Sequence, residues 1–518
     1  MSGIEFKQAI HLTPKRESPG TAGGGRRTLW PWLVFVVLAA AHAWLYTQLS
    51  ESRRDGGWPG IVMRNWHENG YWALHGQLVA NPGGLANSEE AFIHPGHRPT
   101  FLIPAYLLKE LPGASFRDGV LYDLAVVGAT FAALLALFGS NWRGVFLGVA
   151  VCFAPGFLHN VSSLDPVGTP ALLGLAAMSF AASRFARLGN DISIYISALA
   201  VALVAMLLNW FMLFPLGVAA TYVFCKRADR KSTAAFFLPP LLVGLIVLAV
   251  CVHGRNAAGG GAAPGEISNA YLWGALGHDG AGMTFGTAFV RLTAVNILAW
   301  LPLLAAGLVV VIVNGLGEKC RRALWPLLAS VAAVFALRNY HAQHPWNIAC
   351  IIGLGLLFSI ELLTDSAPLA FPKWRRFATG AVLVFTLAYA AVWIACDAAH
   401  GRNAASVREL VVKNTPRNSL IVVAGGLVSN GDAGVKEFAE VFDRHLIALD
   451  AWDHQTTGRD VFLLTHDTLP DGVTPVAQSH AAPAGVTGPP VNFYRENISR
   501  RPPGSRRDFY DDWQLGKY

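Results

Sequence analysis

The sequence predicts a polytopic α-helical membrane protein with about eleven transmembrane helices and a small α/β domain near its C-terminal end. Charged residues make up 14% of the 518 residues and hydrophobic residues 53%, whereas soluble chains carry about 25% charge. Apolar windows of about 20 residues, long enough to cross a bilayer, recur along the chain. Lys and Arg gather on alternate connections between these windows. This composition excludes a cytosolic enzyme, a secreted disulfide-rich protein and a disordered chain.

The apolar windows set the order of the predicted spans. The first window follows basic residues, as a signal peptide would, but its length is that of a full span and predicts an uncleaved anchor. The eleven predicted spans are 29–49, 119–139, 144–159, 167–185, 191–209, 211–225, 234–253, 286–314, 322–337, 346–364 and 377–397. An odd number of spans places the two chain ends on opposite sides of the membrane.

Basic residues predict which side each connection faces. If the N-terminus is cytoplasmic, the inner connections hold clusters such as Lys226 and Arg227, whereas the outer connections at 160–166 and 210–215 hold no Lys or Arg. This positive-inside pattern predicts a multi-pass protein of the bacterial inner membrane whose residues after 398 lie in the periplasm. The formal net charge of +7 therefore reports topology, and no nucleic-acid partner is expected.

The predicted domain organisation has four parts. They are a cytoplasmic basic tail at 1–28, a transmembrane module at 29–397 with long outer loops at 50–118 and 254–285, a periplasmic α/β domain at 398–495, and a basic C-terminal tail at 496–518. Within the first loop, Thr100 to Leu111 is apolar but too short to span, so it is expected to lie along the interface or to re-enter.

The α/β prediction for 398–495 depends on periodicity. Val407 to Lys413 and Val435 to His445 have helical patterns, whereas Leu420 to Ala424 and Val461 to Thr465 are β-branched or apolar runs typical of strands. Gly425-Gly426 follows the first strand without a complete phosphate-loop motif and indicates a turn. The basic run Arg500 to Arg507 is expected to be solvated and disordered.

Four short polar motifs fall on the predicted outer side. They are Glu68-Asn69-Gly70-Tyr71, His97-Arg98-Pro99 before an apolar segment, Leu164-Asp165-Pro166, and Arg338-Asn339-Tyr340 with Pro345 downstream. In this order and topology, over residues 29 to about 365, the chain resembles the GT-C glycosyltransferases, in particular the lipid A aminoarabinose transferases and the protein O-mannosyltransferases. It departs from them in having Glu68 where Asp is usual, Arg98 where Lys is usual, and an extra residue between Arg338 and Tyr340.

The resemblance implies an inverting glycosyltransferase that moves a sugar from a polyprenyl-phosphate donor to a cell-envelope acceptor, which is a glycan, lipid A or a protein. Two alternatives stay open. A transporter or flippase of a lipid-linked glycan should show inverted repeats and polar residues at mid-membrane, whereas here the charges gather at the outer ends of the spans. A polymerase or ligase that uses pyrophosphate-linked oligosaccharides shares the same chemistry.

The departing phosphate needs no protonation, so the chemistry requires one carboxylate that activates the acceptor hydroxyl as a general base. Glu68 is the candidate, although a carboxylate in a long outer loop is often only solvated. Asp165 is the second catalytic candidate, with the alternative that it caps the following helix. Tyr71, His67 and Tyr340 are candidate substrate-binding residues beside these motifs.

The released phosphate requires fixed positive charge, which the forked donors of arginine match. Arg338 is the first candidate, with the alternative that it only snorkels to the interface. The further candidates are Arg98, His97, His341 and His344. These histidines lie outside the His-Glu-x-x-His context of a zinc helix, and the six cysteines form no Cys-x-x-Cys pair. Hence no metal and no other cofactor is expected.

Overall fold

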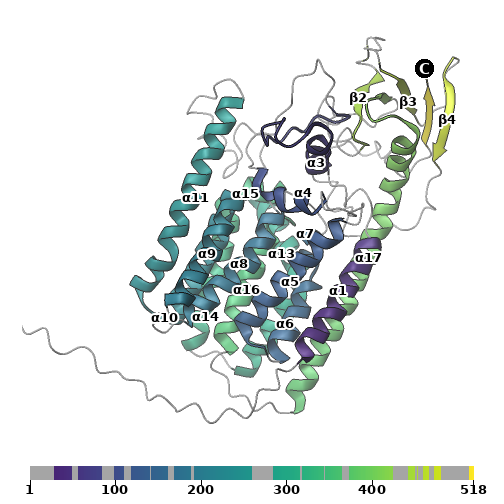
Figure 1. Cartoon of the computed structure of the whole chain (residues 1–518). Helices are drawn as coiled ribbons and strands as arrows, with labels where there is room; N and C mark the ends of the chain where they lie inside the picture. Colours follow the sequence, from purple (N-terminus) through teal and green to yellow (C-terminus); the bar gives the residue numbers. More distant parts are fainter. Residues whose placement is uncertain are drawn as a thin grey trace, which may run out of the picture.

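The structure is a computed structural model in which a bundle of long helices carries, at one end, a layer of short helices and a five-stranded sheet (Figure 1). It describes residues 29–48, 57–84, 99–109, 118–140, 142–161, 168–187, 192–258, 284–314, 318–343, 345–364, 373–423, 442–449, 452, 459–465, 472–479 and 513–517.

The bundle helices follow the predicted windows. They are α1 (Trp30–Gln48), α5 (Asp118–Phe138), α6 (Trp142–Cys152), α7 (Pro155–Val161), α8 (Gly168–Ala186), α9 (Ile192–Leu208), α10 (Leu213–Arg227), α11 (Arg230–Ala258), α13 (Phe285–Asn314), α14 (Glu318–Ala336), α16 (Ala349–Thr364) and α17 (Lys373–Asn414). Each of the eleven windows is helical over most of its length, and the window at 144–159 is divided between α6 and α7, which are bent by 62°.

By length and composition, three of the described helices can cross a membrane on their own, namely α5, α11 and α13, and the bent pair α6 and α7 makes up to four. Shorter apolar helices of 10–17 residues lie at Trp30–Leu45, Ile192–Leu208, Ala349–Thr364 and Gly380–Ala395. The chain is therefore a mostly helical protein with several apolar helices, and the number eleven for its spans stays a prediction.

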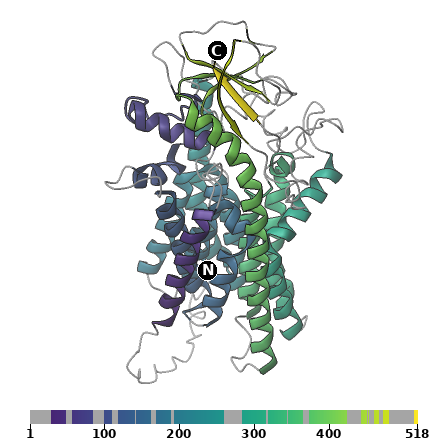
Figure 2. The same ribbon diagram turned by 90° about the vertical axis from the view of Figure 1, so that its right-hand side faces the viewer.

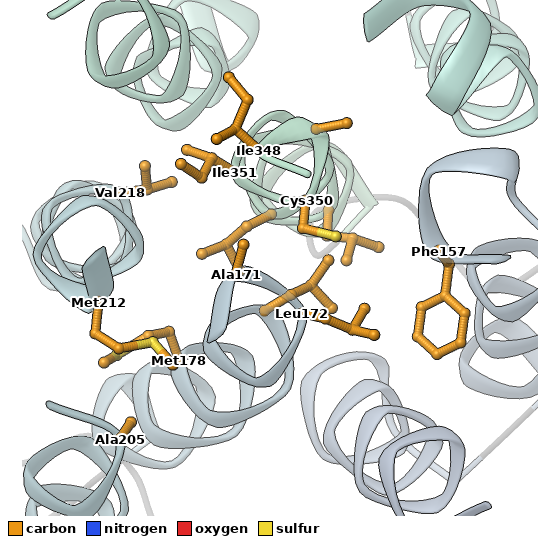
Figure 3. Close-up of a cluster of buried hydrophobic side chains, with 14 of the residues drawn as sticks. Phe157, Ala171, Leu172, Met178, Ala205, Met212, Val218, Ile348, Cys350 and Ile351 are labelled. Carbon is orange, nitrogen blue, oxygen red and sulfur yellow. The ribbon is translucent and has the colours of Figure 1, made fainter. Parts of the chain in front are cut away.

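The core of the bundle is apolar and closely packed. Figure 3 shows Leu172, Met178, Met212 and Cys350 among the buried side chains that face one another from neighbouring helices. Lipid tails are as apolar as these side chains, so close packing rather than exclusion of water favours the association of the helices.

Trp300 illustrates this packing at a kink in α13. Pro302 has no N–H to donate to the carbonyl of Leu298, and the backbone at Trp300 leaves helical geometry. The Tyr389 hydroxyl of α17 donates to this carbonyl at 3.0 Å. The indole lies so close to Gly353 that a Cβ there would stand 2.4 Å from the Trp300 ring.

Short elements cover the end of the bundle that faces the sheet. They are α3 (Gly57–Asn69), η1 (Pro99–Phe101), α4 (Ile103–Lys109), η2 (Trp210–Met212) and α15 (Arg338–Gln343). The predicted short segment from Thr100 onward forms the end of η1 and α4, and the Thr100 hydroxyl donates to the carbonyl of Leu208, at the end of α9, at 2.7 Å. This contact places η1 against the end of the bundle.

The C-terminal sheet is reached directly from α17, which runs the full height of the molecule (Figure 2). Its strands are β1 (Leu420–Val423), β2 (His445–Ala448), β3 (Val461–Thr465), β4 (Thr474–Ser479) and β5 (Trp513–Lys517), in the order β2-β1-β3-β5-β4. β1 pairs in parallel with β2 and β3, whereas β5 is antiparallel to β3 and β4.

The sheet differs from the sequence prediction at two places. The segment predicted as a helix at 435–445 falls largely outside the described residues, but its last residue, His445, begins β2. The predicted basic tail at 496–518 contains β5, which pairs with strands on both sides. Both neighbours supply main-chain partners for β5, so tertiary context stabilises a strand that only Trp513 and Leu515 suggest by alternation. The basic run at 500–507 lies outside the described residues.

Candidate functional site

The first candidate cluster lies at the end of α3. Its buried Trp66 anchors the helix, since the indole N–H donates to the carbonyl of Gln77 at 2.7 Å and the ring packs edge-on against Tyr71 and Tyr106. Tyr106 belongs to α4, so this contact fixes α3 on the layer below. Gly70, with φ +87°, ends the helix in the left-handed conformation that glycine adopts most readily.

The end of α3 presents His67 and Glu68 outward. Trp66 points inward, so the next two side chains are exposed, and the Glu68 side chain is 46% exposed. Its Oε1 forms an ion pair with Nη1 of Arg417, which lies between α17 and β1. Tyr71 lies beside this end, and its ring stacks on Tyr106 with centroids 6.0 Å apart. Glu68, His67 and Tyr71 thus all lie at this end of α3, and their common role in one site stays a prediction.

Asp443, just before β2, joins the C-terminal domain to α3. Its carboxylate accepts from Nε of Arg64 at 2.6 Å, from Nε of Arg417 at 2.8 Å and from the main-chain N–H of Gly83 at 3.1 Å. Burial opposes ionisation of this group, but the two guanidinium groups and the Gly83 N–H outweigh it and hold the pKa of Asp443 below its usual range. The carboxylate therefore stays charged near neutral pH.

His445 lies next to the same network. A Cβ on Gly83 would stand 2.5 Å from the His445 ring, so only glycine leaves room for this imidazole. Burial lowers the pKa of His445 from its usual 6.5, the charge of Asp443 opposes this shift, and the charge of Arg417 adds to it.

The second candidate cluster surrounds α15, at the end of the bundle. The guanidinium of Arg338 lies 5.4 Å from the centre of the Phe285 ring, within the range of a cation–π contact. Among the described residues, its Nε has no hydrogen-bond partner. One turn further on, His341 is buried, its Nδ1 contacts the carbonyl of Val334, and its ring packs against Phe211 and Phe214. The structure thus places the His341 side chain in the aromatic packing of the bundle.

The third candidate cluster joins α7 to the turn before α16. Nε2 of His159 lies 3.2 Å from Oδ1 of Asn347, and the side chain of Asn160 donates to the carbonyl of Trp346 at 2.8 Å. A Cβ on Gly168 would stand 2.1 Å from Oδ1 of Asn160. The described residues on both sides of the Asp165 motif therefore lie against the turn that follows the Arg338 motif.

Several predicted site residues lie outside the described residues, namely Asp165, Arg98, His97 and His344. Tyr340 falls within α15, but its side chain is outside the description. The described side chains form two groups, with Glu68, His67 and Tyr71 at the end of α3, and Arg338 with His341 at α15. Within the described part of the chain, no contact joins Glu68 to Arg338, so their meeting in one site stays a prediction.

Sequence reasoning missed the residues that surround Glu68. Asn65, Arg64, Arg417 and Asp443 carry no motif, and the first two are separated from the last two by more than 300 positions along the chain. It also gave no role to Arg291, which is buried near the start of α13. Only the positions of Arg64 and Asn65, one turn before Glu68 on the same helix, give a signal in the sequence.

Among the described residues, no group of three or more His, Cys, Asp or Glu side chains is arranged to hold a metal ion. The chemistry that the described clusters offer is therefore that of carboxylates, guanidinium groups and aromatic rings. A carboxylate at 46% exposure can accept a proton from a hydroxyl that approaches from outside, and arginine can hold a phosphate.

No protein-family model matches this sequence, and no curated protein matches it. Among solved structures, ArnT from Cupriavidus metallidurans in the apo state matches with a TM-score of 0.55 at 13% identity, over 95% of this chain and 98% of that chain. The same protein bound to undecaprenyl phosphate matches with a TM-score of 0.54 at 12% identity, over the same shares of both chains. A weaker likeness, with a TM-score of 0.43 at 12% identity, is to the oligosaccharyltransferase of Archaeoglobus fulgidus, over 82% of this chain and 65% of that chain. The chain thus has the fold of ArnT, the kind of fold that its resemblance predicted.

Proposed function

We propose that this protein is an inverting membrane glycosyltransferase that moves a sugar from a polyprenyl-phosphate donor to an acceptor of the cell envelope. The observation that carries this proposal is the match to ArnT, which extends over nearly the whole length of both chains and includes a structure bound to undecaprenyl phosphate. The motif order at the outer ends of the helices supports it. The acceptor is a glycan, lipid A or a protein.

In the proposed reaction, the bond between the sugar C1 and the phosphate oxygen breaks as an acceptor oxygen bonds to C1 from the opposite face. Glu68 takes the proton of the acceptor hydroxyl, and its exposed carboxylate is accessible for this role. The developing positive charge on the sugar is also stabilised by a nearby carboxylate, by analogy with glycoside hydrolysis. Asp165 orients the acceptor or shares the role of base.

The departing phosphate carries its negative charge away without a general acid. Arg338 is proposed to bind it through its forked N–H donors, which match phosphate oxygens. In support of this, the buried Nε of Arg338 has no hydrogen-bond partner among the described residues, and a buried donor without a partner is costly unless a ligand supplies one. Arg98, His97 and His344 are proposed as further phosphate contacts. The packing of His341 against Phe211 and Phe214 favours a supporting role beneath Arg338.

We also propose that the site faces the periplasm of a bacterial inner membrane, with the N-terminus in the cytoplasm. The Lys and Arg clusters at the opposite end of the bundle, such as Lys226 and Arg227 at the end of α10, support this orientation. A lipid-linked donor suits a compartment without nucleotide sugars. The proposed reaction requires no metal or other cofactor, because Arg338 supplies the positive charge.

Two other functions make different predictions. A flippase of lipid-linked glycans has no need of a general base, so it should tolerate the loss of Glu68. A polymerase or ligase should release a pyrophosphate carrier and add more than one sugar in a single transfer. The described charges lie mostly at helix ends, which favours a transferase over a transporter.

Mass spectrometry of envelope glycans and lipid A, in cells with and without the gene, tests the proposal. We expect one species to lose the mass of one sugar in the deletion strain and to regain it when the gene is restored. Restoration by Glu68→Gln at the wild-type level would favour the transporter, and a gain of several sugars at once would favour the polymerase or ligase.

A further inference from the structure

One arginine connects the C-terminal domain to the candidate base. The guanidinium of Arg417 donates hydrogen bonds to two residues and forms an ion pair with a third, while its Nη1 makes no hydrogen bond among the described residues. Nε contacts the carboxylate of Asp443 at 2.8 Å, Nη2 donates to Oδ1 of Asn65 at 3.0 Å, and Nη1 pairs with Glu68. Asn65 and Glu68 lie on α3, whereas Asp443 lies beside β2, so this side chain bridges the two regions.

The position of Arg417 does not depend on Glu68. Asp443 is 5% exposed and is held in turn by Nε of Arg64 at 2.6 Å. Asn65 is fully buried, and its own amide group donates to the carbonyl of Val79 at 2.8 Å. Arg417 itself is 19% exposed. The guanidinium is therefore fixed by buried partners, and the exposed Glu68 is the mobile member of the pair.

The two oxygens of Glu68 have different surroundings. Oε1 is engaged by Arg417, whereas Oε2 faces Gly84, where an added Cβ would stand 3.5 Å away. Gly84 has φ +87°, a conformation that other residues rarely adopt. An added Cβ would only make an ordinary van der Waals contact with Oε2, and the Glu68 side chain as a whole is 46% exposed.

We propose that Arg417 is a positioning residue, and that the C-terminal domain docks on α3 to present it to Glu68. A free glutamate side chain samples several rotamers, and holding one oxygen removes that freedom before the acceptor arrives. The inference rests on the proposed function, because it assigns Arg417 a task only if Glu68 is the base. It gives the C-terminal domain a role in the reaction at a distance from the donor.

The test uses the full-length protein with Arg417→Ala, Arg417→Lys and, as matched control, Arg459→Ala, an arginine of the same domain outside the contacts above. Each variant is expressed in deletion cells, and the rate of sugar addition after induction is followed by mass spectrometry of the glycan that the wild-type gene restores. Hydrogen exchange of the purified proteins in detergent micelles reports the opening of residues 57–69 and 442–449.

We expect Arg417→Ala to lower the rate of transfer roughly tenfold to hundredfold, the upper range of coupling between residues in direct contact. Exchange should accelerate in both segments. Arg417→Lys keeps the positive charge but lacks the planar guanidinium donors, so its rate of transfer should lie between those of Arg417→Ala and the wild type. Arg459→Ala should change the rate less than about twofold. In a Glu68→Asp background, whose carboxylate no longer reaches Arg417 fully, the loss caused by Arg417→Ala should shrink to less than about threefold.

Two outcomes would overturn the inference. In the first, Arg417→Ala accelerates exchange but leaves transfer at the wild-type rate, so that the contact is only structural. In the second, Arg417→Ala lowers the rate of transfer by the same factor in the wild-type and Glu68→Asp backgrounds. Failure of the proposed function has a different signature, which is full transfer by Glu68→Gln.

Discussion

The two candidate clusters at the end of the bundle that faces the sheet satisfy their charges in different ways. Around Glu68, charged groups pair with one another, and Asp443 alone contacts two arginines. Around Arg338, the neighbours are the aromatic ring of Phe285 and the buried His341, and the Arg338 Nε is without a hydrogen-bond partner among the described residues. In one cluster the charged side chains pair with one another, whereas in the other the described neighbours of the arginine are aromatic or buried.

This difference suggests a division of labour. Paired charges fix the geometry of α3 against the C-terminal domain, since each carboxylate or guanidinium restricts the next. A guanidinium that packs its face on an aromatic ring can still donate to an anion through its N–H edge. We therefore expect substitutions at α15 to affect donor binding, and substitutions in the network of Asp443 to affect the acceptor side and local stability.

The largest effect expected from breaking this division is that of Arg338→Ala. Loss of the guanidinium N–H donors should lower undecaprenyl phosphate binding and sugar transfer together, each by about tenfold to hundredfold. The reason is that hydrogen bonds to charged groups are worth about 1.5–3 kcal/mol. Native mass spectrometry with undecaprenyl phosphate measures the first quantity, and the glycan assay the second. Arg322→Ala, near the opposite end of α14, is the matched control. Unchanged binding of undecaprenyl phosphate would show that Arg338 only snorkels to the membrane interface.

A smaller effect is expected from Asp443→Ala. The change leaves Arg64 and Arg417 without their shared carboxylate, and the free energy of local opening of β2 should fall by about 1–3 kcal/mol. Hydrogen exchange of β2 amides measures it. Asp229→Ala, which removes the Ser232 contacts at the start of α11, serves as control and should leave β2 unaffected. Unchanged exchange in β2 would show that the network contributes little.

The smallest expected effect is a pH dependence due to His445. Its pKa in the folded protein is lowered from 6.5, so its contribution to stability is fully present above pH 6.5 and is lost as the pH falls through the lowered folded value. Asp443 titrates below its usual 3.8 and does not contribute in this range. After correction for the intrinsic pH dependence of amide exchange, we expect the β2 amides to be less protected at pH 5.5 than at pH 7.5, by an effect that His445→Gln reduces. An equal pH dependence in both proteins would assign the effect to other groups.

The sequence predicted much of the fold because long apolar windows leave few alternatives to a helix. The windows at 119–139 and 286–314 became α5 and α13 within one or two residues. The sequence did not predict strand β5, because Trp513 and Leu515 alone give a weak alternation and the strands that pair with β5 lie far away in the chain. Strand formation there is decided by tertiary context.

The candidate site was predictable in its motifs and not in its contacts. Glu68 and Arg338 stood out because charges next to apolar windows are costly and therefore informative. Arg417 and Asp443 did not, because they lie in a polar domain where charged residues are common. Only folding brings them within 3 Å of each other and of α3.

The central claim is that Glu68 acts as the base of a transferase whose donor is held elsewhere. The most direct measurement compares Glu68→Gln with the wild type in undecaprenyl phosphate binding and in sugar transfer. The account predicts unchanged binding with transfer lowered at least about a hundredfold, the contribution of a general base. Transfer at the wild-type rate by the purified Glu68→Gln protein would contradict it.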